Sequence, residues 1–255
     1  MEILAQPSLS FAESLYEQND YYNSATEYER YLFYHNNDSL FSEIKLKLAK
    51  AYIMSAEINK AEKILQELSS KKIKASQDAQ LNLAKLYMLQ GELFKAKIEL
   101  NDLLLFNINI QDTVKKESNL NLGYIALQEH EPNEAINYFN QAQDSFLIAQ
   151  TKVITKLPKK NVLLSQILSS IIPGTGEVYC GKYGWGILSF LVNSASIYGT
   201  IKCYQNKQYL DATLIFSLFF TRFYNGTRNN ARDFAQEYNN KIYSAKLKNF
   251  NTYYR

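Results

Sequence analysis

The stretch that decides the fold is NLGYIALQEHEPNEA, residues 121–135. Leu122, Gly123, Ala126 and Ala135 stand at positions i, i+1, i+4 and i+13. The first three share one side of a helix, a polar turn with a proline follows, and Ala135 is small enough for a second helix to cross the first closely. The stretch therefore predicts two helices joined by a tight turn.

The same pattern recurs upstream of this stretch. Ala25, Ala61, Ala96 and Ala135 are 36, 35 and 39 residues apart. A period of 20 to 50 residues is typical of a solenoid, and each helix pair carries an apolar face that it cannot bury alone. The matching stripe residues of the second and third units are Leu48, Ala49, Tyr52, Leu83, Ala84 and Tyr87. Stacking of neighbouring pairs is therefore expected.

These units resemble the tetratricopeptide repeat family over roughly residues 7–142. The fourth unit matches best, and the first is the loosest because Ala12 stands where the family usually has leucine. The resemblance implies an all-α solenoid of about four repeats with a capping helix, residues 7–157, that binds protein partners. In that fold the first helices line the concave face.

Positions on those first helices are the candidate binding residues. Two residues beyond each stripe leucine are Lys50, Lys85 and Tyr124, and one residue before it are Asn82 and Asn121. Lysine and asparagine side chains could meet a peptide carboxylate or an extended backbone. The alternative, that the lysines are only solvated, stays open.

A different module follows, residues 158–240. Its motif is Ser-x-x-x-Pro-Gly-x-Gly-x-x-Tyr-x-Gly, and a second motif lies near Arg222. The motif residues are Pro173, Gly174, Gly176, Tyr179, Gly181, Arg222, Tyr224 and Gly226. This pattern resembles a membrane-associated C-terminal module found after tetratricopeptide repeats in some bacterial envelope proteins, although Glu177 replaces the usual glutamine. A polar tail is expected for residues 241–255.

Charge separates the two parts of the chain. Residues 1–160 hold 18 basic and 21 acidic side chains, whereas residues 161–255 hold 10 and 4. The excess of basic side chains in residues 161–255 suits an anionic membrane surface. It does not indicate nucleic-acid binding, because the chain has no run of five like charges. The apolar runs 185–201 and 212–220 are short for spanning, because Asn193 and Ser196 interrupt the first. We expect a helical hairpin that packs on the solenoid or lies on the membrane surface.

The compartment is predicted from weak signals that disagree. Ile3 to Gln6 could be the remainder of a cleaved leader, with Ala5 at the junction, which favours the bacterial periplasm or cell envelope. Lysines and arginines crowd one end of the apolar hairpin, which for a spanning hairpin favours the cytoplasmic face of the inner membrane. Cys180 and Cys203 are expected to be free thiols.

No constellation of residues predicts catalysis, a metal or a cofactor. Gly176 to Lys182 has the glycine and lysine spacing of a phosphate loop, but Tyr183 follows instead of serine or threonine. His35 and His130 have no ligand partners at metal-binding spacing. We therefore expect a non-enzymatic scaffold. The alternatives are a structural subunit of an envelope machine, such as a flagellar motor or secretion apparatus, and a nucleotide-dependent enzyme.

Overall fold

The computed structural model describes residues 8–254 except for residues 37, 38, 72, 74 and 108. It is all-helical, with no strand in the described part of the chain, as the sequence predicts. The chain divides into two compact units, Met1–Lys152 and Val153–Arg255. The leader-like junction predicted at Ala5 lies outside the described residues.

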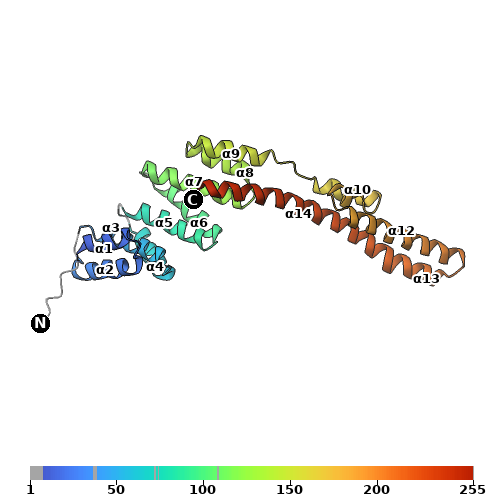
Figure 1. Cartoon of the computed structure of the whole chain (residues 1–255), viewed down its shortest axis with the longest axis horizontal. Helices are drawn as coiled ribbons and strands as arrows, with labels where there is room; N and C mark the ends of the chain where they lie inside the picture. The colour runs from blue at the N-terminus through green and yellow to red at the C-terminus, as the bar shows by residue number, and fades with distance from the viewer. Residues whose placement is uncertain (1–7, 37–38, 72, 74, 108, 255) are drawn as a thin grey trace. The chain divides into compact units, whose positions relative to one another are not determined.

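Unit 1 is a succession of helices in which each packs against the next (Figure 1). In addition, α3 contacts α5 and α5 contacts α7, so the first helices of successive pairs lie next to one another. The helices are α1 (Leu9–Glu17), α2 (Tyr21–Tyr34), α3 (Phe41–Met54), α4 (Ile58–Ser69), α5 (Ala75–Leu89), α6 (Leu93–Phe106), α7 (Asp112–Gln128) and α8 (Pro132–Gln141). A ninth helix, α9 (Ser145–Thr155), contains the division between the units.

The repeated alanines lie where the helices cross. Ala25 is 2% exposed, and Ala61, Ala96 and Ala135 are fully buried. Gly123 shows how close the approach is, because a Cβ added there would lie 2.4 Å from the Phe139 ring on α8. The small residues that reveal the period are thus the ones that the packing requires.

The two helices within each pair are joined by the same turn geometry. A residue just after the first helix adopts a positive φ at Asn19, Ala56, Gly91 and His130. The next backbone N–H then bonds back five residues, as from Glu131 to the Ala126 carbonyl at 2.8 Å. This is the hydrogen bond of a Schellman helix end, which satisfies a carbonyl that the helix leaves open. Only one of the four positions is a glycine.

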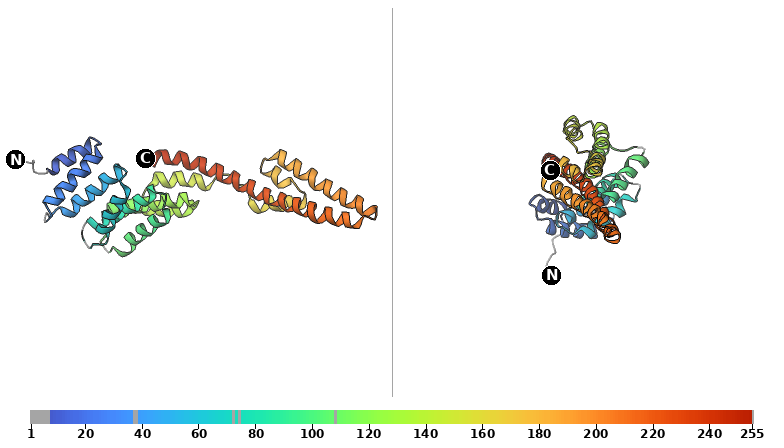
Figure 2. Two further views of the ribbon diagram at one scale, coloured as in Figure 1. Left: turned by 90° about the horizontal axis from the view of Figure 1, so that it is seen from below. Right: turned by 90° about the vertical axis from the view of Figure 1, so that its right-hand side faces the viewer.

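Unit 2 contains a helical hairpin. α12 (Tyr183–Gln205) runs to a turn and the chain returns beside it through α13 (Tyr209–Leu214), a π-helical segment η1 (Ile215–Phe220) and α14 (Thr221–Tyr254) (Figure 2). The short helices α10 (Val162–Ile171) and α11 (Thr175–Tyr179) pack against α14. The boundary predicted at residue 240 falls inside α14, so residues 241–254 continue that helix rather than forming a separate tail.

Within the residues that the structure describes, no helix is both long enough and apolar enough to cross a membrane.

Candidate functional site

The first candidate residue, Lys50, lies exposed on α3 beside a cavity. The cavity has a volume of about 500 Å³, and its lining residues are Glu13, Tyr16, Glu17, Tyr28, Lys47 and Lys50. Lys47 is paired with Glu13 at 2.5 Å, whereas Lys50 has no ion-pair partner in the described part of the chain. Burial, and then the nearby Glu13, raise the pKa of Tyr28 to about 12, so its phenol stays protonated. The cavity therefore offers both charges and aromatic walls to a ligand.

The other four candidate binding residues do not lie in one site with Lys50. Lys85 forms an ion pair with Glu117 on α7. Asn82 donates its amide to the Asp78 carbonyl in its own helix at 2.6 Å. Tyr124 is half-buried, and Asn121 is only 4% exposed and belongs to the packed side of α7. Of the five candidates, Lys50 is the one that is exposed and lines a cavity.

Polar contacts one repeat apart were missed by the sequence reasoning. Lys47 reaches Glu13, 34 residues earlier, and both Lys85–Glu117 and Lys97–Glu129 are 32 residues apart. The separation is close to the repeat length, so each pair joins helices of neighbouring repeats. A search for opposite charges at that spacing could have found them, but their side chains are partly exposed, which keeps the stabilisation by each pair small.

The stripe tyrosines make a second set of contacts between repeats. Tyr52 donates its hydroxyl to Glu29, and Tyr87 donates to Glu62 at 3.0 Å and accepts from Gln66 at 3.1 Å. Burial is the main cause that raises the pKa of both phenols, and the neighbouring carboxylates raise it further. Tyrosine at this position therefore packs its ring between helices and ties its hydroxyl to the preceding pair.

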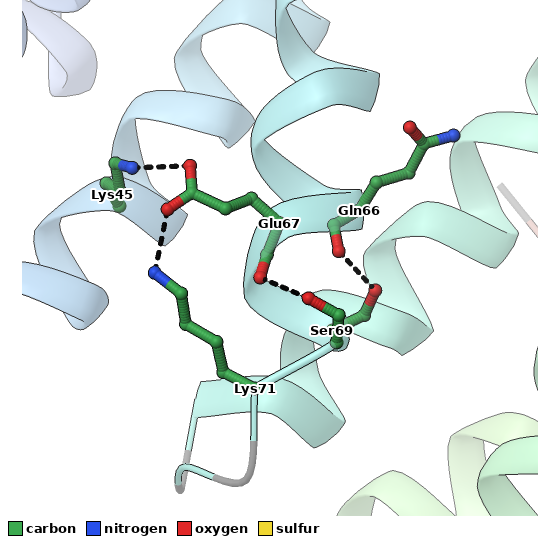
Figure 3. A network of polar contacts seen from close by, with 6 residues as sticks. Lys45, Gln66, Glu67, Ser69 and Lys71 are labelled. Atoms are coloured by element: carbon green, nitrogen blue, oxygen red, sulfur yellow. Dashed lines mark hydrogen bonds and ion pairs between the residues drawn. The ribbon is translucent and has the colours of Figure 1, made fainter.

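Glu67 at the end of α4 is held by two lysines (Figure 3). Lys45 on α3 and Lys71 lie 2.6 Å and 2.7 Å from its carboxylate. Their hydrogen bonds lower the pKa of Glu67 to about 2. The carboxylate is therefore ionised throughout the neutral range, and it connects α3 to the end of α4.

In unit 2 the glycine motif makes close helix contacts. A Cβ on Gly176 would lie 2.0 Å from the Ser165 carbonyl oxygen and 2.8 Å from the Ala231 Cβ, and Gly174 is equally crowded by Gly186. Pro173 directly precedes Gly174, which adopts a positive φ of 101°. Gly181 lies in the turn before α12 and Gly226 in α14, and a Cβ on either would meet nothing. Gly174 and Gly176 are therefore the packing glycines of the motif.

The motif tyrosines tie α10 to its neighbours. The Tyr179 hydroxyl accepts from the Asn161 backbone N–H at 3.2 Å, and the Tyr224 hydroxyl donates to the Ser170 carbonyl at 2.8 Å. Two partners were missed by the sequence reasoning: Lys160, whose ammonium lies 4.5 Å from the Tyr179 ring centre, and Asn239, which exchanges two hydrogen bonds with the Lys160 backbone. Arg222 is exposed on α14.

Glu177 is completely buried in this unit. Its carboxylate accepts from Ser169 on α10 at 2.8 Å and from Ser189 on α12 at 2.9 Å. Farther along α12, the Asn193 amide donates to Thr227 on α14 at 3.2 Å. The interior between these helices therefore combines polar side chains and the Glu177 carboxylate with small apolar residues such as Ala231 and Ala235.

The hairpin of unit 2 exposes many large apolar side chains on its surface. Large apolar side chains are exposed along the hairpin, among them Trp185, Ile187, Leu188, Leu191, Tyr198, Leu210, Leu218 and Phe219, which range from 51% to 82% exposed. Water-exposed proteins seldom present so large an apolar surface unless it is covered by a partner or by lipid. This surface is the second candidate site.

Comparison with known proteins adds no family: no protein-family model and no curated sequence matches the chain.

Proposed function

We propose that the chain is a non-enzymatic scaffold of the bacterial cell envelope, with a tetratricopeptide-type solenoid in unit 1 that binds a partner protein and a C-terminal module that attaches the chain to the membrane. The proposal combines a binding cavity in unit 1 with an apolar surface in unit 2. The envelope location follows from the sequence resemblance and the basic balance after residue 160.

The binding role is supported mainly by Lys50, which is exposed at a cavity and has no ion-pair partner in the described part of the chain. Three other lysines on α3 and α5, namely Lys45, Lys47 and Lys85, are each neutralised by a glutamate of a neighbouring helix. Lys50 instead lies exposed at a cavity with Glu17 and two tyrosines. An unpaired ammonium beside aromatic walls suits a partner segment that brings its own carboxylate.

Crosslinking in native membranes tests this role. The partner recovered by the full chain should be lost or strongly reduced with Lys50→Glu, because the reversed charge repels a carboxylate. Lys63→Glu is the matched control, since Lys63 is an exposed lysine on α4, the second helix of its pair. Equal recovery by the wild type and by Lys50→Glu would contradict a binding site at this cavity.

A further inference from the structure

The exposed apolar side chains of α12 surround more than half of that helix. At about 100° per residue, they cover an arc of roughly 200° or more. They are Tyr183, Trp185, Ile187, Leu188, Phe190, Leu191, Ile197, Tyr198, Ile201 and Tyr204. The remaining side carries Gly186, Asn193 and Ser196, which are buried. The small and polar residues of α12 thus face its neighbours, and most of its large apolar residues face outward, although the Trp185 ring also lies beside Phe234 of α14.

Charge divides the hairpin in the same sense. No charged residue occurs between Lys182 and Lys202, whereas exposed Arg222, Arg228 and Arg232 follow one another along α14. α14 packs beside α12 over this length, as the contacts Asn193–Thr227 and Trp185–Phe234 show. The uncharged length of α12 thus lies beside a helix that carries three arginines, of which Arg232 is paired with Asp233 at 2.9 Å.

This arrangement distinguishes lipid from a protein partner. A protein interface concentrates its apolar anchors in one patch with a polar rim. An apolar arc of this width along the whole of α12 is too wide for one flat partner to cover, whereas acyl chains surround a helix without preference for a face. Helices in lipid also pack through small and polar residues and turn their large apolar residues outward.

We infer that the apolar arc of α12 is embedded in the acyl-chain boundary of a lipid membrane, with the arginines of α14 at the level of the phosphates. The partner is thus a lipid surface, and basic α14 side chains would favour anionic headgroups. The inference deepens the proposed membrane attachment and rests on it. Glu177 and its two serines hold α10, α11 and α12 together, which keeps the arc outward.

Trp185 provides the test, because it is the only tryptophan of the chain and lies on the arc with 54% exposure. The full chain is mixed with phosphatidylcholine vesicles that contain phosphatidylglycerol, and flotation and tryptophan fluorescence are recorded. We expect the protein to float, its emission to shift to the blue, and lipids brominated in their acyl chains to quench it. Absence of flotation, or flotation without quenching, would overturn the inference.

A variant pair locates the contact on α12. Leu191→Lys should weaken vesicle partitioning by about tenfold or more, because an exposed leucine on the arc is replaced by a charge. Phe94→Lys is the control, since Phe94 is an exposed apolar residue of α6 in unit 1 and should leave partitioning unchanged. Circular dichroism confirms that both remain folded. An equal effect of the two changes would overturn the inference.

Two further measurements distinguish a lipid surface from a second copy of the chain and from the partner of unit 1. If the protein forms a dimer without vesicles and Leu191→Lys abolishes it, the arc is covered by a second copy and the inference fails. Partner capture by unit 1 is measured in parallel with Lys50→Glu, which should not alter vesicle binding. If Lys50→Glu retains partner capture, the binding role of unit 1 has failed and the lipid inference is unaffected. If Leu191→Lys leaves vesicle binding unchanged, the lipid inference has failed and the binding role of unit 1 is unaffected.

Discussion

Gly174 and Gly186 approach so closely that a Cβ on Gly174 would lie 2.1 Å from the Gly186 carbonyl oxygen. The contact joins the turn before α11 to the first turn of α12, and it requires that both residues lack a side chain. Gly174 also has a φ of 101°, which an L-residue with a side chain adopts only at a cost.

Gly174→Ala should therefore destabilise unit 2 by about 2–4 kcal/mol, through both steric overlap and backbone strain. Trp185 fluorescence during urea unfolding reports on this unit. Gly226→Ala is the matched control: its Cβ would meet nothing, and alanine should stabilise α14 by about 0.5–1 kcal/mol. Similar unfolding midpoints for the two variants would contradict the packing role of Gly174.

The buried carboxylate of Glu177 gives a second prediction. Glu177→Ala leaves the hydroxyls of Ser169 and Ser189 without their acceptor and opens a cavity, so we expect a loss of about 2–4 kcal/mol. Glu177→Gln retains one acceptor oxygen and the volume, so it should be milder. Urea unfolding followed at Trp185 compares them, and a glutamine variant as unstable as the alanine variant would argue against this network.

How much of this could be predicted from sequence depends on what sets each feature. The alanine period was readable because a close helix crossing tolerates little else, as buried Ala61 and Ala96 show. The ion pairs were not, because long side chains can reach several partners. From the sequence, Asn193 and Ser196 are predicted to interrupt an apolar run. In fact they form its buried side, since the large apolar residues of α12 lie on its outer surface rather than against its neighbours.

The turn residues with positive φ give a third prediction. Ala56 has a φ of 63°, where glycine avoids the strain of a Cβ. Ala56→Gly should stabilise the chain by about 0.5–1 kcal/mol, as the relief of strain exceeds the added chain entropy of glycine. The converse change, Gly91→Ala, should destabilise by a similar amount. Thermal unfolding measures both, and destabilisation by Ala56→Gly would show that the alanine is not strained.

Glu67 predicts a dependence of stability on acid pH. Its pKa is lowered from 4.5 to about 2 in the folded chain by Lys45 and Lys71. The stabilisation is therefore present above pH 4.5 and is lost as the pH falls toward 2. Because the side chain is 44% exposed, solvent screening limits it to about 1 kcal/mol or less. Glu67→Gln should lose this portion of the acid dependence, and the difference should shrink in high salt.

The glycine and lysine spacing of residues 176–182 yields a fifth prediction. Gly176 lies inside α11 with its backbone against Ser165, and Lys182 is paired with Glu237 at 3.1 Å. A phosphate-binding loop needs open backbone N–H groups and an available lysine. We expect no ATP binding by calorimetry at micromolar concentrations. Binding that Lys182→Ala abolishes would revive the nucleotide-dependent alternative.

The Schellman-type turn has a consequence for how the chain can be altered. The same five-residue back-bond recurs in unit 2, from Lys182 to Glu177 and from Gln208 to Cys203, at 2.9 Å in each case. The helix pairs of unit 1 and the hairpin of unit 2 thus share one turn geometry, although their surfaces differ in polarity. Turns with the same geometry can replace one another. We therefore expect that the turn Gln90–Glu92, placed at the tip of the hairpin, would preserve the direction of the returning helix. The helices differ in the faces that they present, whereas the turns inside the helix pairs and at the tip of the hairpin follow a single pattern.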